Sequence, residues 1–159
     1  MSIDPRALRS VLSTYATGVA VATAALPDGR RAGLTINSFT SVSLEPPLVL
    51  FCLEKRAAAF PLFSAASGFA INILGAEQEA VSRAFATRGQ GEERWQGVAL
   101  RQGQQEAPLL DSALAVLECS HHVRHDGGDH VIFVGQVVNM ARREGAPLLY
   151  WHSGYRSLL

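Results

Sequence analysis

Uncharged side chains that can form hydrogen bonds crowd the stretch between residues 35 and 43, just before a very apolar run at 48–53. They are Thr35, Asn37, Ser38, Thr40, Ser41 and Ser43. Polar and apolar residues alternate as far as Asn37, but Ser38 is polar where an inward apolar residue is due, and this slip predicts a β-bulge. The residues alone leave two interpretations open: an edge strand with a solvated hydroxyl face, or a surface that binds a flat, polar, uncharged ring.

A cysteine and several histidines form a second group that could do chemistry. Its members are Cys119, His121, His122, His125 and His130. Cys119 and His121 would share one face of a strand, and a thiolate with imidazoles can bind zinc. A tetrahedral site needs a second pair of ligands, however, and this run supplies one only by contorting a hairpin. We therefore expect exposed or partner-facing histidines and no bound metal.

Two common functional motifs are missing from the sequence. The glycines closest to a dinucleotide-binding GxGxxG pattern are Gly89, Gly91 and Gly97, but they lie in a polar loop rather than after a strand. No GxSxG string is present, although Ser, His and Asp all occur, so a hydrolase triad is disfavoured. If a nicotinamide nucleotide binds to this chain, we expect that no Rossmann crossover holds it.

The composition is that of an ordinary folded domain. Of 159 residues, 48% are apolar and 18% charged, with a formal net charge of zero and no acidic or basic block. These values argue against disorder, nucleic-acid binding and binding to an anionic membrane, and near neutrality favours a homo-oligomer. No apolar run approaches the roughly 20 residues that span a bilayer, and the N-terminus lacks a signal-peptide core. We expect one domain, 1–159, in the cytoplasm, with Cys52 and Cys119 as buried, reduced thiols.

Three short helices are expected. The first begins at Asp4 and Pro5 and repeats apolar residues at the spacing of one buried face, namely Leu8, Val11, Leu12 and Tyr15. The second lies within 57–66, and the third covers 77–87, with acidic residues in its first turn and arginines near its end, as the helix dipole favours. A polar, Gly-rich segment follows at 88–108, and residues 88–97 are its best candidate for a mobile loop or lid.

Most of the remaining chain is expected to form strands, at 18–26, 31–39, 48–53, 68–74, 113–123, 130–140 and 147–151. A Pro-Asp-Gly turn at 27–29 joins the first two. Gly127 and Gly128 predict a two-residue hairpin turn, which would place His125 opposite His130. Six or seven strands joined mainly by turns, with isolated helices, predict an antiparallel barrel with helical additions rather than a doubly wound sheet.

Several strings of the sequence, taken together, resemble the flavin reductase family, the small reductase components of two-component flavin-dependent monooxygenases. They are GLTINSFTSVSLEPPLVLFCL at 33–53, FAINIL at 69–74, ERWQGV at 93–98, PLLDSALAVLEC at 108–119, GDHVIFVGQV at 128–137 and PLLYWHSGYR at 147–156. They occur in family order across nearly the whole chain. The resemblance implies a mainly β fold, the antiparallel FMN-binding split β-barrel of six or seven strands with a few short helices.

The resemblance also assigns residues to a flavin site. The isoalloxazine ring would be wrapped by Thr35, Ile36, Asn37, Ser38, Phe39, Thr40 and Ser41, through backbone amides and the side chains of Asn37 and Ser38. The ribityl chain and phosphate would be held by Cys52, Leu53, Lys55, Arg56, Ala57 and Ala58. Relatives usually carry Ser or Thr after the basic residue, whereas this chain reads EKRAAAF at 54–60. Arg83 and Phe85 match positions that approach the flavin.

On the nicotinamide side, the resemblance makes His130, the histidine of the family's GDH string, the residue that steers the nicotinamide. Trp151, His152 and Tyr155 match the aromatic and basic tail that lines the same side. The implied activity is that of an NAD(P)H:flavin oxidoreductase, in which hydride passes from NADH or NADPH to FMN or FAD. A homodimer is implied too, as is a separate oxygenase that receives the reduced flavin. The alternative is a flavin-binding electron carrier or sensor with the same barrel and no reductase turnover.

Overall fold

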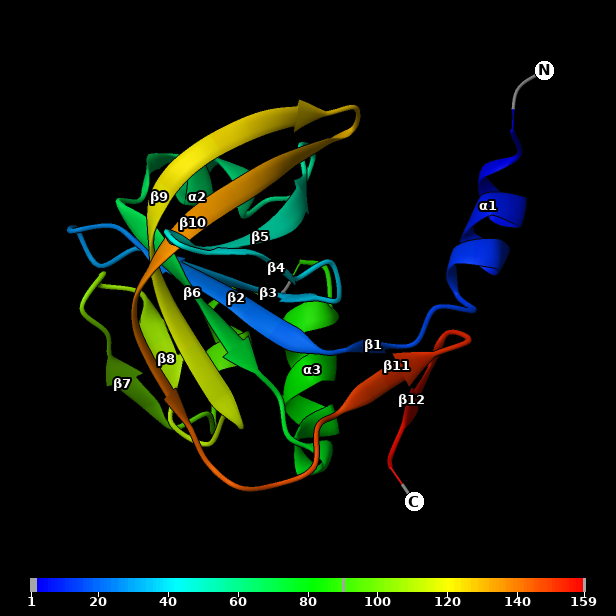
Figure 1. Cartoon of the computed structure of the whole chain (residues 1–159). Helices are drawn as coiled ribbons and strands as arrows, with labels where there is room; N and C mark the ends of the chain where they lie inside the picture. The colour runs from blue at the N-terminus through cyan, green and yellow to red at the C-terminus, as the bar shows by residue number, and fades with distance from the viewer. Residues whose placement is uncertain (1–2, 90, 159) are drawn as a thin grey trace.

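The structure, a computed structural model, describes residues 3–89 and 91–158, and its main element is a seven-stranded antiparallel sheet (Figure 1). In sheet order the strands are β3 (Arg31–Ile36), β2 (Ala20–Ala25), β6 (Gly68–Ile73), β9 (Ala115–Gly127), β10 (His130–Arg142), β5 (Pro47–Glu54) and β4 (Thr40–Leu44). The two edge strands, β3 and β4, are consecutive in sequence, with only residues 37–39 between them. The sheet must therefore curl until its edges approach each other, which confirms the expected antiparallel split barrel.

Phenylalanine side chains fill the interior of the curled sheet. Strand β5 turns every second residue inward, as period-two strand geometry requires. The Phe51 ring stacks on that of Phe133 with 5.3 Å between centroids and meets the Phe69 ring edge-on at 5.0 Å. Helix α2 (Phe60–Ala65) adds the fully buried Phe63. Burial of each such ring stabilises the fold by about 1.5–3 kcal/mol.

Smaller elements surround the main sheet. β7 (Leu100–Gln102) pairs with β8 (Pro108–Leu110), and a three-stranded sheet has the order β1 (Thr17–Gly18), β11 (Leu149–Trp151), β12 (Gly154–Arg156). Helix α3 (Glu79–Ala86) follows the 3₁₀ turn η1 (Ala76–Gln78) and precedes a second such turn, η2 (Glu92–Trp95). The positions of α2 and α3 confirm two of the expected helices. Within residues 3–89 and 91–158, no helix is long and apolar enough to cross a membrane.

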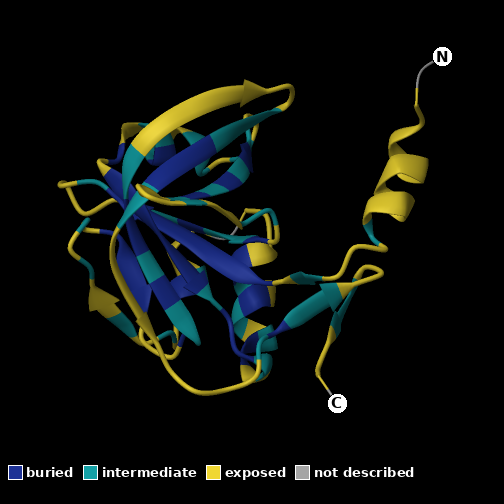
Figure 2. Cartoon of the chain, in the orientation of Figure 1, coloured by how far each residue is buried: buried dark blue, intermediate teal, exposed yellow. Residues whose placement is uncertain are grey.

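The N-terminal helix α1 (Pro5–Leu12) forms as predicted, but its apolar face is not buried. Asp4 caps the helix by accepting hydrogen bonds from the backbone N–H groups of Arg6 and Ala7, both at 3.2 Å. The expected buried residues are exposed: Leu8 by 46%, Val11 by 67%, Leu12 by 61% and Tyr15 by 78%. The prediction of a buried face is therefore wrong for this chain on its own, because α1 stands apart from the main sheet (Figure 2).

The hairpin between β9 and β10 is shifted by one residue from the predicted register. Gly127 pairs with His130, so the two central residues of the turn are Gly128 and Asp129, and His125 lies opposite Ile132. Gly128 has a φ of 76°, which suits the first central position of a two-residue turn that favours glycine. The prediction that His125 and His130 face each other is therefore wrong.

The segment expected to be a mobile loop is anchored by Trp95. The Trp95 side chain is only 6% exposed, and its ring meets the edge of Phe85 at 4.8 Å. Gly33 makes room for this pair, since a Cβ there would lie 2.6 Å from the Phe85 ring and 3.0 Å from the Trp95 ring. Within 88–97 the chain also forms η2, and Gln90 lies outside the described residues. The prediction of a lid is wrong where Trp95 packs into the interior.

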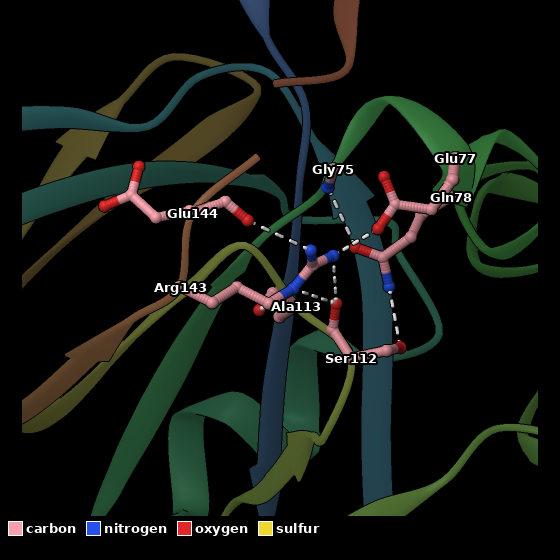
Figure 3. A network of polar contacts seen from close by, with 7 residues as sticks. All are labelled: Gly75, Glu77, Gln78, Ser112, Ala113, Arg143 and Glu144. Carbon is pink, nitrogen blue, oxygen red and sulfur yellow. Dashed lines mark hydrogen bonds and ion pairs between the residues drawn. The ribbon is translucent and has the colours of Figure 1, made fainter. Parts of the chain in front are cut away.

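A network of polar contacts around Arg143 fixes the chain just before the C-terminal hairpin (Figure 3). The Arg143 guanidinium donates to the Ser112 carbonyl over 2.8 Å and forms an ion pair with Glu77. The amide of Gln78 accepts from Gly75 N over 2.8 Å and donates to the Ser112 hydroxyl over 2.9 Å. Three segments far apart in the sequence are thus held together, so β11 and β12 leave the barrel from a fixed point.

Candidate functional site

The open side of the barrel lies where its two edge strands meet. β3 pairs only with β2 and β4 only with β5 in the described chain, so every second residue of each edge turns its backbone N–H and C=O groups outward. Such groups form hydrogen bonds with whatever occupies the edge. The residues 35–41 that the sequence marked for ring binding are therefore the residues that surround the opening.

Ser38 ties this opening to strand β5. Its hydroxyl accepts a hydrogen bond from Cys52 N at 3.0 Å and donates to Cys52 O at 3.3 Å. The predicted bulge at Ser38 is wrong in position: the strand ends at Ile36, and the register shift lies between Ser41 and Ser43 in the β4–β5 pair. The hydroxyl of Ser38 is therefore occupied by the backbone of β5.

Asn37 differs from its neighbour, because its side chain is exposed and has no hydrogen bond with any other described residue. Thr40 and Ser41 are also exposed, on the edge strand β4, while Phe39 packs against the main core. The side chains of Ile36 and Leu53 are 6% and 1% exposed, so only their backbone groups can reach a ligand. The surface of the opening is consequently polar and uncharged.

The turn after β5 provides cationic groups, but only one of them is available. The Lys55 ammonium forms an ion pair with Asp126 and donates to the Gly128 carbonyl over 2.7 Å. This contact lowers the pKa of the Asp126 carboxyl, chiefly through the hydrogen bond from Lys55. Arg56 is exposed and makes no ion pair within the described ranges, so its guanidinium is the free cation of this turn.

Backbone donors accompany Arg56 in this turn. Ala57 N donates to the Glu54 carbonyl over 3.0 Å, but the N–H groups of Ala58 and Ala59 have no acceptor among residues 3–89 and 91–158. A guanidinium beside free backbone N–H groups is a suitable environment for a phosphate. Because this chain has alanine after Arg56 where relatives usually have Ser or Thr, one hydroxyl is lost, but the guanidinium and the backbone N–H groups remain.

His130 lies at the same end of β5, opposite Glu54 in the β5–β10 ladder. Its Nδ1 is 2.7 Å from the Asp129 carboxylate, and the pair lowers the pKa of Asp129, first through this hydrogen bond and then through the charge of His130. A carboxylate only accepts hydrogen bonds, so Nδ1 is the donor. The Nε2 atom is left to interact with a ligand, in an orientation that Asp129 sets.

A chain of contacts connects the end of β3 to the C-terminal hairpin. Thr35 Oγ1 donates to the Ser82 carbonyl over 2.6 Å, and Ser82 Oγ shares a hydrogen bond of 2.8 Å with the Tyr155 hydroxyl. The guanidinium carbon of Arg83 lies 4.9 Å from the centre of the Tyr155 ring. Three of the predicted residues, Thr35, Arg83 and Tyr155, are thus brought together by a serine that the sequence did not single out.

Other predicted residues lie apart from this group. Phe85 is 2% exposed and packs on Trp95, so its side chain is part of the core. Trp151 and His152 lie at the far end of the hairpin, where Trp151 Nε1 donates to Thr14 O over 3.1 Å and His152 N to Ser13 O over 3.0 Å. They are therefore placed beside α1 rather than beside Thr35.

The cysteine and histidine group is dispersed along β9 and the start of β10. His121 is half-buried, with Nε2 at 3.1 Å from the Phe63 carbonyl, and its burial lowers its pKa. Burial, with a smaller contribution from Glu118, raises the pKa of Cys119 to about 12. No three His, Cys, Asp or Glu residues of the described chain are grouped closely enough to hold a metal ion. Cys119 and His121 therefore pack with the core, whereas His122 and His125 are exposed, as was expected of the histidines.

Three residues that contact the candidate site residues were missed by sequence reasoning: Ser82, Asp129 and Asp126. Asp129 could have been found, since a carboxylate next to a ligand-directed histidine commonly orients it. Ser82 and Asp126 carried no local signal, because their partners, Tyr155 and Lys55, are 73 and 71 residues away in sequence.

Comparisons with known proteins find relatives over nearly the whole chain. Residues 12–159 match the family model described as the flavin reductase like domain. An FMN reductase (NADH) of Agrobacterium fabrum is 40% identical over 147 residues, 92% of this chain and 82% of that protein. The reductase component of 4-hydroxyphenylacetate 3-monooxygenase from Thermus thermophilus is 40% identical over 154 residues, 96% of each. The solved NADH:FAD oxidoreductase of Streptomyces globisporus C-1027 has a TM-score of 0.90 at 37% identity, covering 100% of this chain and 97% of the other. The chain therefore belongs to the flavin reductase family.

Proposed function

We propose that the chain is an NAD(P)H-dependent flavin reductase, which transfers hydride from NADH or NADPH to FMN or FAD and supplies the reduced flavin to a separate flavin-dependent oxygenase. Membership of the family supports this proposal, as do the names of the two relatives and of the solved neighbour. The observation that carries it is the convergence of residues 35–41, the end of β5 and His130 on the open side of one sheet.

The open edge fits the polar edge of a flavin ring. That edge presents acceptors and one donor, so it requires several neutral partners at fixed spacing. Outward backbone groups of β4 and the free amide of Asn37 are partners of this kind. No charged residue occurs between residues 32 and 44, so no full charge there would retain the anionic reduced ring. When bound, the flavin supplies N5 as the hydride acceptor.

The two ends of the candidate site would bind different groups, the flavin phosphate at one end and the nicotinamide at the other. Arg56 and the N–H groups of Ala58 and Ala59 would hold the flavin phosphate. His130 would direct Nε2 to the nicotinamide, and Tyr155 would offer an aromatic face on that side. The chain then acts by holding donor and acceptor at reacting distance, about 3–3.5 Å, rather than by acid-base chemistry.

Steady-state oxidation of NADH and NADPH with excess FMN or FAD tests this proposal. A flavin reductase turns over many times, and comparing the four combinations gives the preferred pair. A protein that binds one yellow flavin and oxidises no more than one equivalent of nucleotide would be an electron carrier or sensor, and the proposal would be wrong.

A Ser38→Ala variant should bind flavin more weakly and be less stable than the wild type. Loss of the hydroxyl leaves Cys52 N and Cys52 O without their partner and frees the loop at 37–39, at a cost of about 1–2 kcal/mol in the free energy of unfolding. Urea denaturation and flavin fluorescence quenching measure the two effects. Ser43→Ala is the matched control, since the Ser43 hydroxyl has no partner within the described residues, and equal behaviour of the two variants would contradict the role of Ser38.

A homodimer is part of the proposal, and the apolar face of α1 is the surface that we assign to it. Ile3, Leu8, Val11, Leu12 and Tyr15 are all exposed in the single chain, from 46% to 78%. A row of apolar residues on a helix is normally covered. A second copy is the chosen occupant, because the chain has no net charge to oppose self-association.

A Val11→Glu variant should therefore elute as a monomer where the wild type is a dimer. A carboxylate at the centre of an apolar interface would cost several kcal/mol of association free energy. Light scattering coupled to size-exclusion chromatography measures the mass, and Arg30→Glu, a charge change at an exposed turn, is the control. A Val11→Glu protein that stays dimeric would exclude this face from the interface.

The remaining expectations are also proposals. We treat residues 1–159 as one flavin reductase-like domain that works in the cytoplasm, where the free thiols Cys52 and Cys119 would stay reduced. The oxygenase partner is proposed from relatives named as reductase components of monooxygenases. Coupled product formation with a purified flavin-dependent oxygenase would test that step.

A further inference from the structure

A cavity between α1 and the β11–β12 turn is lined by several basic groups. Its volume is about 320 Å³, and its lining residues are Arg6, Arg9, Ser10, Ser13, His152 and Ser153. Two guanidiniums, one imidazole and three hydroxyls thus border one space, and its lining contains no carboxylate. A lining of this composition suits an anion with several oxygen atoms.

Neither arginine is neutralised. Among residues 3–89 and 91–158, no ion pair or side-chain hydrogen bond involves Arg6 or Arg9. Asp4, the closest acid in sequence, uses its two carboxylate oxygens to cap α1. Because Arg6 and Arg9 are three positions apart, they lie on one side of the helix and repel each other, and Arg6 lies in the first turn, where the helix dipole disfavours a cation. A bound anion would relieve both costs.

The two walls of the cavity are fixed to each other. His152 N and Trp151 Nε1 donate to the Ser13 and Thr14 carbonyls, at 3.0 Å and 3.1 Å. His152 and Ser153 both have left-handed φ angles, 46° and 57°. Glycine or asparagine is the usual choice at such turn positions, yet here the turn presents an imidazole and a hydroxyl to the cavity.

We propose that this cavity binds the pyrophosphate of the nicotinamide dinucleotide, with Arg6 and Arg9 as its main ligands. The inference rests on the proposed reductase function, because it takes Tyr155 as part of the nicotinamide side. Trp151 pairs with Gly154, so His152 and Ser153 form the turn of the hairpin, and Tyr155 lies about two strand rises back from that turn, about 7 Å. One ribose and a phosphate group cover such a span, so a ring near Tyr155 places its pyrophosphate beside the two arginines.

The test compares two hydride donors in an Arg6→Gln, Arg9→Gln double variant. NADH carries the pyrophosphate, whereas 1-benzyl-1,4-dihydronicotinamide has the same reacting ring and no phosphate. We expect kcat/KM for NADH to fall by about tenfold or more, with the rate for the benzyl compound and the KM for FMN unchanged. The control is Arg30→Gln, Arg142→Gln, which removes the same charge from residues outside the cavity and should leave all rates as in the wild type. Circular dichroism checks that α1 is retained.

A binding measurement separates this inference from the function on which it rests. ADP-ribose, which has the pyrophosphate but no nicotinamide, should bind to the wild type in calorimetry and fail to bind to the arginine double variant. If ADP-ribose does not bind to the wild type, or if both hydride donors are affected equally, the cavity is not the pyrophosphate site. A raised KM for FAD with an unchanged KM for NADH would overturn the assignment to the nicotinamide nucleotide. ADP-ribose binding without NADH turnover would refute the reductase and leave the site standing.

Discussion

An Asn72→Ala variant should unfold at a much lower urea concentration than the wild-type protein. Asn72 is fully buried in β6, and its amide donates to the Val21 carbonyl over 3.0 Å and to Thr23 Oγ1 over 3.2 Å, and accepts from Leu110 N over 2.8 Å. Removing the Asn72 amide leaves Leu110 N–H and the Val21 carbonyl buried without partners, which costs about 1–3 kcal/mol of stability for each group. The loss of side-chain atoms also opens a cavity. We expect the free energy of unfolding to fall by about 3–5 kcal/mol, a large share of the 5–15 kcal/mol usual for a domain.

Asn37→Ala is the matched control for this measurement. It makes the same chemical change at an exposed amide that has no hydrogen bond within the described chain, so its free energy of unfolding should change by about 0.5 kcal/mol or less. Similar unfolding curves for the two variants would show that the Asn72 contacts do not hold β8 to the sheet. The same contacts explain why an isolated asparagine lies in the middle of the apolar string at 69–74.

Six of the seven strands of the main sheet could be predicted because each carries a local signal, whereas β4 at 40–44 was not among the expected strands. The Pro-Asp-Gly turn at 27–29 and the apolar run at 48–53 depend only on neighbours in sequence. The β9–β10 register could not be predicted to one residue, since two adjacent glycines permit two turns and only the φ of Gly128 distinguishes them. For α1, periodicity identifies the apolar face correctly, but it does not say what that face packs against.

In the candidate site, too, the types of residue could be predicted from the sequence, but their partners could not. Composition predicted that 35–41 is a polar, uncharged surface, and the structure adds that it borders the open side of the barrel. The partners of its hydroxyls were beyond prediction, because Thr35 bonds to a residue 47 positions away and Ser38 to one 14 positions away. Lys55 was expected to hold a phosphate, whereas its ammonium is paired with Asp126. The sequence shows that Lys55 is charged, but it does not show that the fold places Asp126, 71 residues away, beside it.

The second large effect is expected at His130, where alanine should raise the KM for the nicotinamide nucleotide or lower kcat while sparing flavin binding. His130 occupies the start of β10 beside the end of β5, and the Asp129 carboxylate 2.7 Å from Nδ1 orients the imidazole and leaves Nε2 without a partner among the described residues. Loss of one positioning contact to the donor corresponds to a fall in kcat/KM of about 10- to 100-fold. Stopped-flow hydride transfer and flavin fluorescence titration measure the two properties separately.

Two further variants serve as comparisons for this experiment, Asp129→Asn with an intermediate expected effect and His122→Ala with none. The asparagine keeps the shape of the side chain but weakens the bond that orients the imidazole, so its kcat/KM should lie between those of the wild type and His130→Ala. His122 is exposed on β9 at a register shift and is not opposite any residue of β10, so His122→Ala should leave both constants unchanged. If His130→Ala also leaves kcat and KM unchanged, the nicotinamide is held by the aromatic hairpin alone, and Asp129 serves only to close the β9–β10 turn.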